Sequence, residues 1–148
     1  MGRRVPAALR RLVAARADYL CEYCLIHDED RAFGCQVDHI ISEKHGGMSE
    51  SINLAYACPP CNRAKGSDVA AIAIKTGILT RLYNPRTDTW WKHFKLDGVR
   101  ITPISGIGEV TARILRFNDD ERCMERRLLQ ERGRYPSTAA ARRTAGLM

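Results

Sequence analysis

Four of the six cysteines in this 148-residue chain form two pairs with the same spacing. The pairs are Cys21-Glu22-Tyr23-Cys24 and Cys58-Pro59-Pro60-Cys61. A two-residue gap lets both sulfurs of a pair approach one ion from a single turn, and four soft thiolates are the donor set that a structural Zn²⁺ prefers. The cytosol, where we expect this protein, also disfavours disulfides. We therefore predict a structural zinc site made by Cys21, Cys24, Cys58 and Cys61.

Two alternatives to this site stay open. His27 also has ligand spacing from Cys24 and is able to replace one sulfur, and reduced cysteines are able to pack as small hydrophobic residues. We favour the four-cysteine site because four sulfurs complete a tetrahedral shell. Such a shell leaves no position for a reacting water, so the zinc is not catalytic. Cys35 and Cys123 have no paired partner and are predicted to be packing residues.

The elements on either side of the first cysteine pair must position it. Pro6 and an apolar stripe flanked by arginines predict a helix over residues 6–17, and the cysteine pair follows it in a tight turn. A strand-like run over residues 33–37 ends on residues 38–41. After a polar, glycine-containing loop, residues 52–57 are able to return as a second strand.

The second cysteine pair leads into a helical pattern. Pro59 and Pro60 suit the entrance of a short helix, and Gly66 suits its end. Residues 68–76 predict another short helix with an Ala and Ile face, closed by Gly77.

The remaining third of the chain predicts a hairpin and two helices. The turn dipeptide Asp97-Gly98 favours a hairpin over residues 93–104. Helices are expected over residues 109–118 and 120–132. Residues 133–148 are expected to be a flexible tail.

The charge balance indicates a polyanionic partner. Lys and Arg number 24 against 17 Asp and Glu, which gives a net charge of +7. Such an excess favours DNA, because each neutralised phosphate releases counterions; a generic soluble surface is the competing explanation. The chain has no apolar run long enough to span a bilayer and no signal-peptide core at its start. We expect a soluble, cytoplasmic protein with no membrane partner.

A further set of residues lies between and beyond the cysteines. The set comprises Val37-Asp38-His39-Ile40-Ile41, Gly46-Gly47, Asn53-Leu54, Asn62 and Lys65-Gly66. With the cysteine pairs, it resembles the HNH endonuclease motif, in the zinc-containing branch whose third motif residue is Asn. The resemblance spans about residues 20–66 and implies an α+β fold with a ββα-metal nuclease core. The core would carry the zinc staple, a helix before it, and a small hairpin-and-helix extension after it.

The resemblance also implies a chemistry and a role for each motif residue. His39 would be the general base of a metal-dependent endonuclease that hydrolyses DNA phosphodiester bonds. Asp38 and Asn62 would hold the catalytic cation, and their hard oxygens suit Mg²⁺ or Mn²⁺. Asn53 would bond the loop backbone and so fix the orientation of His39. The implied catalytic residues are therefore His39, Asn53 and Asn62.

Two features of this region limit the interpretation. Side chains of the neighbours Asp38 and His39 diverge in a regular strand, so both would serve one phosphate only where the backbone bends, at a strand end or a bulge. Arg63 and Lys65 are predicted phosphate contacts, with a solvated helix face as the competing interpretation. His45 is better explained as a plain loop histidine.

The extension offers aromatic and basic side chains. Two of Trp90, Trp91 and Phe94 are expected to close the core, with stacking on nucleic acid as the alternative. The arginines of the two late helices are expected on solvated faces, where they would extend a basic surface. These are Arg113, Arg116, Arg122, Arg126 and Arg127.

We divide the chain into a nuclease domain over residues 1–80, an extension over 81–132 and a tail over 133–148. Cleavage of both DNA strands would need a homodimer or a protein partner. The chief alternative function is a noncatalytic zinc-ribbon-like module that binds nucleic acid or protein, in which Asp38 and His39 are structural. A purely structural interaction domain is a third.

Overall fold

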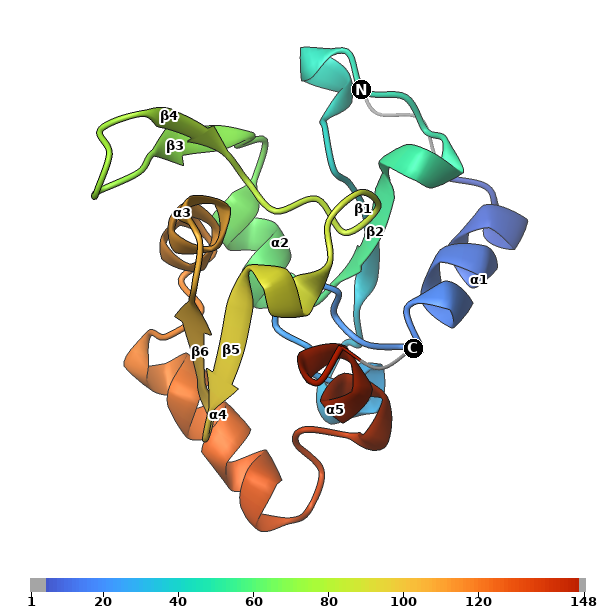
Figure 1. Ribbon diagram of the computed structural model, residues 1–148. Helices are drawn as coiled ribbons and strands as arrows, with labels where there is room; N and C mark the ends of the chain where they lie inside the picture. The colour runs from blue at the N-terminus through green and yellow to red at the C-terminus, as the bar shows by residue number, and fades with distance from the viewer. Residues whose placement is uncertain (1–4, 147–148) are drawn as a thin grey trace.

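A computed structural model describes residues 5–146 of the chain. In that range the fold is α+β, with three two-stranded antiparallel sheets and five α-helices. Figure 1 shows strands β1 (Gln36–His39) and β2 (Leu54–Ala57) and helix α2 (Pro59–Lys65) together near the centre. Helix α1 (Ala7–Arg16) lies on one side of them, and α3 (Gly106–Ile114) and α4 (Asp120–Glu131) lie on the other. Within residues 5–146, no helix combines the length and apolar character that crossing a membrane needs.

The central unit is a ββα arrangement. Strand β1 (Gln36–His39) pairs with β2 (Leu54–Ala57) in antiparallel register, and α2 (Pro59–Lys65) follows directly. The predicted helix after the second cysteine pair is confirmed, with prolines in its first turn and Gly66 at its end. The first strand begins later than the sequence pattern suggested, because residues before Gln36 form a turn that leaves Phe33 91% exposed.

The predicted first helix is confirmed as α1 (Ala7–Arg16), and it covers one face of this hairpin. Val13 is fully buried and packs in a cluster with Leu54 and Tyr56 of β2. Arg16, in the last turn of α1, donates from Nη2 to the carbonyl oxygen of Leu54 at 2.7 Å. The helix therefore holds the loop that connects the two strands where that loop enters β2.

The prediction of a helix over residues 68–76 is wrong. This segment forms β3 (Ala70–Ile72), which pairs with β4 (Leu79–Arg81) around a turn in which Gly77 has φ +69°. A short run of Ala and Ile has no period long enough to separate helix from strand. Tertiary contacts favour the hairpin: Glu109 of α3 (Gly106–Ile114) accepts a hydrogen bond from the Ile74 N–H at 2.7 Å.

The hairpin and helices of the extension are confirmed. Strand β5 (Phe94–Asp97) pairs with β6 (Arg100–Pro103), and α4 (Asp120–Glu131) follows α3. Helix α3 begins earlier than expected, because the Ser105 hydroxyl caps it by accepting from the Gly108 N–H at 2.9 Å.

The extension also completes the core. Trp90 and Phe94 are buried, with ring centroids 5.1 Å apart, whereas Trp91 is 42% exposed. Two of the three aromatics therefore close the core, as predicted. The solvated-face prediction fails for Arg122 and Arg126, which are only 7% and 1% exposed. Both lie on one face of α4, and that face packs inward.

The prediction of a flexible tail after residue 132 is wrong for residues 133–146. This segment contains α5 (Thr138–Thr144), capped by the Ser137 hydroxyl, which accepts from the Ala140 N–H at 3.2 Å. Tyr135 is 3% exposed and Ala140 is fully buried in the main core. Burial of these apolar groups offsets the entropy of ordering the segment. Residues 147 and 148 lie outside the described range.

Candidate functional site

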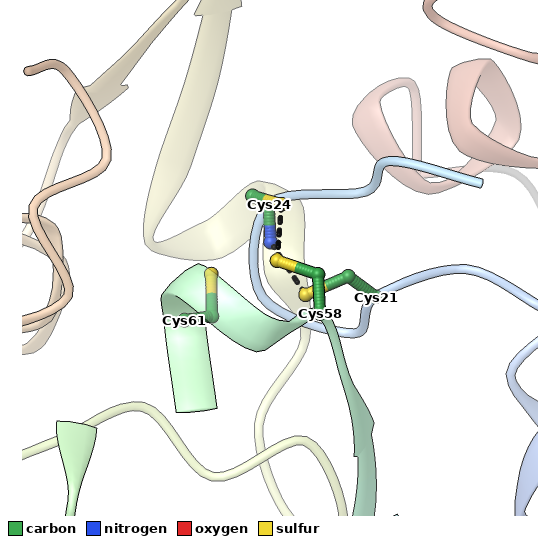
Figure 2. Close-up of side chains that lie close together, drawn as sticks. All are labelled: Cys21, Cys24, Cys58 and Cys61. Carbon is green, nitrogen blue, oxygen red and sulfur yellow. Dashed lines mark hydrogen bonds between the residues drawn. The ribbon is translucent and has the colours of Figure 1, made fainter. Parts of the chain in front are cut away.

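Four buried sulfurs converge beside the central hairpin (Figure 2). Cys21 and Cys24 lie in the loop after α1, Cys58 follows β2, and Cys61 lies in α2. The four Sγ atoms are within 4.8 Å of one another, and all four residues are buried. Residues far apart in the sequence thus form one cluster of donor atoms.

The cluster fits a tetrahedral zinc site. Zn–S bonds of about 2.3 Å place neighbouring sulfurs ~3.8 Å apart in a tetrahedron. The Sγ atoms of Cys24 and Cys58 are separated by 3.6 Å. The alternative ligand His27 is not part of the cluster, and its Nδ1 accepts a hydrogen bond from the Glu29 N–H at 3.0 Å. These residues therefore favour the four-cysteine site over one with a histidine ligand.

The buried thiols must lose protons to bind a metal. Burial raises the pKa of Cys21 and of Cys61, whereas hydrogen bonds from the neighbouring Cys21, Cys58 and Cys61 thiols lower the pKa of Cys24. Zinc competes with these protons, so metal affinity falls as the pH falls.

His39 is the last residue of β1 and faces the loop that leads to β2. Its Nε2 lies 2.8 Å from Ser49 Oγ, and Ser49 Oγ donates to Glu43 Oε1 at 3.3 Å. The side chain of His39 is 20% exposed, so its ring is held without being buried. Sequence reasoning missed Ser49 and Glu43, since no residue spacing indicates which loop side chains reach the imidazole.

Asn53 makes the backbone contacts that were predicted for it. Its Oδ1 accepts from the Ile41 N–H at 2.9 Å, and its Nδ2 donates to the carbonyl oxygens of Ile41 and Met48, both at 2.9 Å. These three bonds close the loop between β1 and β2 across its base. A side chain at Gly47 would clash, because a Cβ there would lie 1.8 Å from the Ile41 carbonyl oxygen.

Asp38 faces α2 instead. Its Oδ2 lies 3.9 Å from Lys65 Nζ, and that buried oxygen accepts no hydrogen bond from residues 5–146. Burial raises the pKa of Asp38 and lowers that of Lys65, and the attraction between the two charges only partly offsets this. Lys65 is 2% exposed and also donates to the His39 carbonyl oxygen at 3.3 Å. A solvated face is therefore wrong for Lys65, whereas Arg63 is exposed.

The bulge that would align Asp38 with His39 is absent from the described hairpin. Asp38 pairs with Ala55 and His39 with Leu54 in regular register, so the two side chains point to opposite faces. They contact different elements, α2 and the loop before β2. Strand β1 ends at His39, and a strand end is the other place where the sequence analysis allows Asp38 and His39 to serve one phosphate.

Asn62 lies in α2, the helix that Asp38 approaches through Lys65. It precedes Lys65 by three residues, and residues three apart are neighbours on a helix surface. The Asn62 side chain is partly buried and has no hydrogen-bond partner among the residues described. The Asp38 Oδ2 atom and the Asn62 side chain therefore both lack a hydrogen-bond partner among the residues described.

Comparison with known families identifies the central unit. Residues 21–68 match the family model described as HNH endonuclease. The matched segment contains all four clustered cysteines, both strands of the central hairpin and α2. No curated protein and no solved structure is significantly similar to the chain.

Proposed function

Because residues 21–68 form an HNH endonuclease domain with a four-cysteine metal site, we propose that the protein is a metal-dependent endonuclease that hydrolyses DNA phosphodiester bonds. His39 is the general base, and Asp38 and Asn62 hold a divalent cation. The zinc bound by the four cysteines is structural. The observation that carries the proposal is the hydrogen-bonded chain from His39 through Ser49 to Glu43.

This chain of bonds assigns the basic atom of His39. The Ser49 hydroxyl donates to Glu43, so it accepts from His39 Nε2. Nε2 then carries the ring proton, and Nδ1 carries the lone pair. The tautomer is assigned from the hydrogen-bond network, in which Nδ1 has no partner among residues 5–146.

His39 Nδ1 therefore takes the proton of the attacking water. The water oxygen bonds to phosphorus, and the bond from phosphorus to the 3′ oxygen breaks. The carboxylate of Glu43, acting through Ser49, favours the imidazolium that forms. Asn53 is a positioning residue in this scheme, since its three bonds fix the loop that carries Ser49.

The residues around Asp38 fit a hard divalent cation. The buried Asp38 carboxylate oxygen, which has no hydrogen bond, and the amide oxygen of Asn62 in α2 are donors that Mg²⁺ and Mn²⁺ accept. When bound, the cation stabilises the negative charge that develops on the phosphate oxygens. Lys65 supplies a second positive charge beside Asp38, and its attraction lowers the pKa of that carboxyl against the larger effect of burial, which raises it.

DNA is the proposed partner of the basic surface. The net charge is +7, and Arg63 presents an exposed guanidinium one residue after Asn62. Phosphate contacts of this kind position a duplex without reading its sequence. Cleavage of both strands would then be arranged by a second copy of the chain or by a protein partner.

Nicking of supercoiled plasmid tests the proposal. We expect the zinc-loaded wild type to nick DNA when Mg²⁺ or Mn²⁺ is added, and His39→Ala to be slower by about 10²–10⁴-fold, the usual contribution of a general base. His45→Ala is the matched control, because His45 is an exposed histidine of the same loop with no role in the scheme.

Equal cleavage by wild type and His39→Ala would reject His39 as the base. If neither protein cleaves while both bind DNA, the noncatalytic nucleic-acid-binding module becomes the better explanation. Zinc content and thermal unfolding of each variant show whether a loss of activity comes from loss of the fold.

A further inference from the structure

Arg122 in α4 contacts a sulfur of the cysteine cluster. Its Nη2 donates to Cys61 Sγ at 3.0 Å, and its Nη1 donates to the Leu115 carbonyl oxygen at 3.0 Å. Arg122 is 7% exposed. No carboxylate forms an ion pair with it among residues 5–146, so the sulfur cluster is the nearest anionic partner that the structure gives it.

Two other residues after position 80 bind the backbone of the first cysteine pair. Trp90 Nε1 donates to the Tyr23 carbonyl oxygen at 2.9 Å, and the Tyr135 hydroxyl donates to the Cys24 carbonyl oxygen at 2.9 Å. All four residues are buried. The cysteine cluster is therefore enclosed by segments that lie outside residues 21–68, the part of the chain that matches the family.

Arg122 differs from Trp90 and Tyr135 in its charge. Four thiolates around one Zn²⁺ leave a net charge of −2 in a buried site, which is costly without a nearby cation. Trp90 and Tyr135 donate neutral hydrogen bonds to carbonyl oxygens, but Arg122 brings a full positive charge to a ligand sulfur. Outer partners of metal ligands commonly change metal affinity by about 10–100-fold.

Arg122 also separates Cys61 from solvent. It lines a cavity of about 550 Å³ between α2 and α4, whereas Cys61 does not line that cavity and is fully buried. Removing the guanidinium would therefore expose the sulfur to water and to chelators as well as remove the charge.

We propose that Arg122 is a zinc-retention residue: it hydrogen-bonds the Cys61 thiolate, compensates the charge of the zinc–cysteine cluster and closes the cluster to solvent. The inference rests on the proposed zinc occupancy of the four cysteines and not on nuclease activity. The extension after residue 80 thereby contributes directly to the metal centre of the HNH domain.

The test compares two arginines of one helix face in the full-length, zinc-loaded protein. Arg126 lies one turn after Arg122 and is 1% exposed, but it donates from Nε to the Val99 carbonyl oxygen at 2.7 Å and from Nη2 to that of Phe117 at 2.8 Å. We expect Arg122→Met to lose zinc to a chromogenic chelator about 10–100-fold faster than wild type. Arg126→Met should lose zinc at the wild-type rate even though it is also destabilised. Arg122→Lys, which keeps the charge, should lie between wild type and Arg122→Met.

A spectroscopic measurement separates this role from simple packing. In protein loaded with Co²⁺ in place of zinc, the sulfur-to-metal charge-transfer band should shift in the Arg122 variants and stay unchanged in Arg126→Met. If Arg122→Met does not fold, the rate of zinc loss and the charge-transfer band of Arg122→Lys test the inference in its place. Equal rates and bands for wild type and the Arg122 variants would overturn the inference alone. A wild type that holds no zinc would overturn the zinc assignment as well.

Discussion

The cysteine cluster and the His39 loop (residues 39–53) lie at opposite ends of the β1–β2 hairpin, and their side-chain partners come from different distances along the chain. Tyr135 bonds the Cys24 carbonyl across 111 residues, and Arg122 reaches Cys61 across 61. The side-chain bonds of His39 and Asn53 reach only 10 and 12 residues. The His39 ring and the Asn53 side chain are thus held by local partners, although Arg16 of α1 also bonds Ser51 of the loop across 35 residues.

This difference has a physical basis. Distant contacts to buried atoms tie several elements together, so the cluster resists opening unless the whole fold opens. Local contacts hold the His39 ring in orientation but leave it partly exposed, as its proposed contact with DNA requires. Mutations at the two ends of the hairpin should therefore differ in kind as well as in size.

The largest effect is expected from Cys58→Ser. Structural zinc in small domains contributes about 10–16 kcal/mol of apparent binding free energy, which is available for folding. We expect the variant to lose zinc and its cooperative thermal transition, measured by elemental analysis and circular dichroism. Cys123→Ser, a cysteine outside the cluster, should keep both. If Cys58→Ser stays folded and keeps its zinc, the cysteine cluster does not supply the stability that we assign to it.

Breaking the ion pair between Arg86 and Glu22 should come next. Glu22 lies between the first two cysteines, its side chain is 2% exposed, and its Oε2 accepts from the Tyr56 N–H at 2.9 Å. Arg86→Met leaves this carboxylate buried without its cation, which costs about 3–5 kcal/mol. Chemical denaturation measures the loss. Glu22→Gln in the same background should recover part of it, and no recovery would show that the pair is not the cause.

Asn53→Ala should have an intermediate effect on stability and a larger one on cleavage. It removes three hydrogen bonds and leaves backbone groups of the loop unpaired, which costs about 1–3 kcal/mol of unfolding free energy. Ser42→Ala is the matched control, because the Ser42 hydroxyl has no partner in the described structure. Equal plasmid nicking by the two variants would show that the loop clamp does not orient His39.

The smallest effect concerns His93, in the extension. Burial lowers the pKa of His93, whose Nδ1 lies 2.7 Å from Ser105 Oγ. The unfolded state then binds a proton more readily than the folded state, so stability decreases as the pH falls through the ordinary histidine range, near pH 6.5. We expect His93→Gln to flatten this part of the stability–pH curve. If the stability–pH curve of His93→Gln matches that of the wild type, other groups cause the loss of stability at low pH.

Local patterns were sufficient for the elements with strong signals. The proline entrance and glycine exit of α2, the Asp97-Gly98 turn and the stripe of α1 each predicted an element that the structure confirms. The segment over residues 68–76 failed, since its Ala and Ile pattern fits a helix and a strand equally. Hydrogen bonds with α3, far along the chain, favour the strand: Glu109 accepts from the Ile74 N–H, and Arg113 donates to the Ile72 carbonyl oxygen.

The sequence by itself determined the cysteine cluster, because ligand chemistry and spacing restrict which residue types can hold a structural metal. The resemblance to the HNH motif implied that Asn53 binds the loop backbone, and the structure confirms these bonds. Only the tertiary structure decided where Arg122 lies. A basic residue in a polar helix predicts a solvated face, but Arg122 is buried against a sulfur 61 positions away along the chain. Local sequence contains no information about that partner, because packing and not periodicity brings the two together.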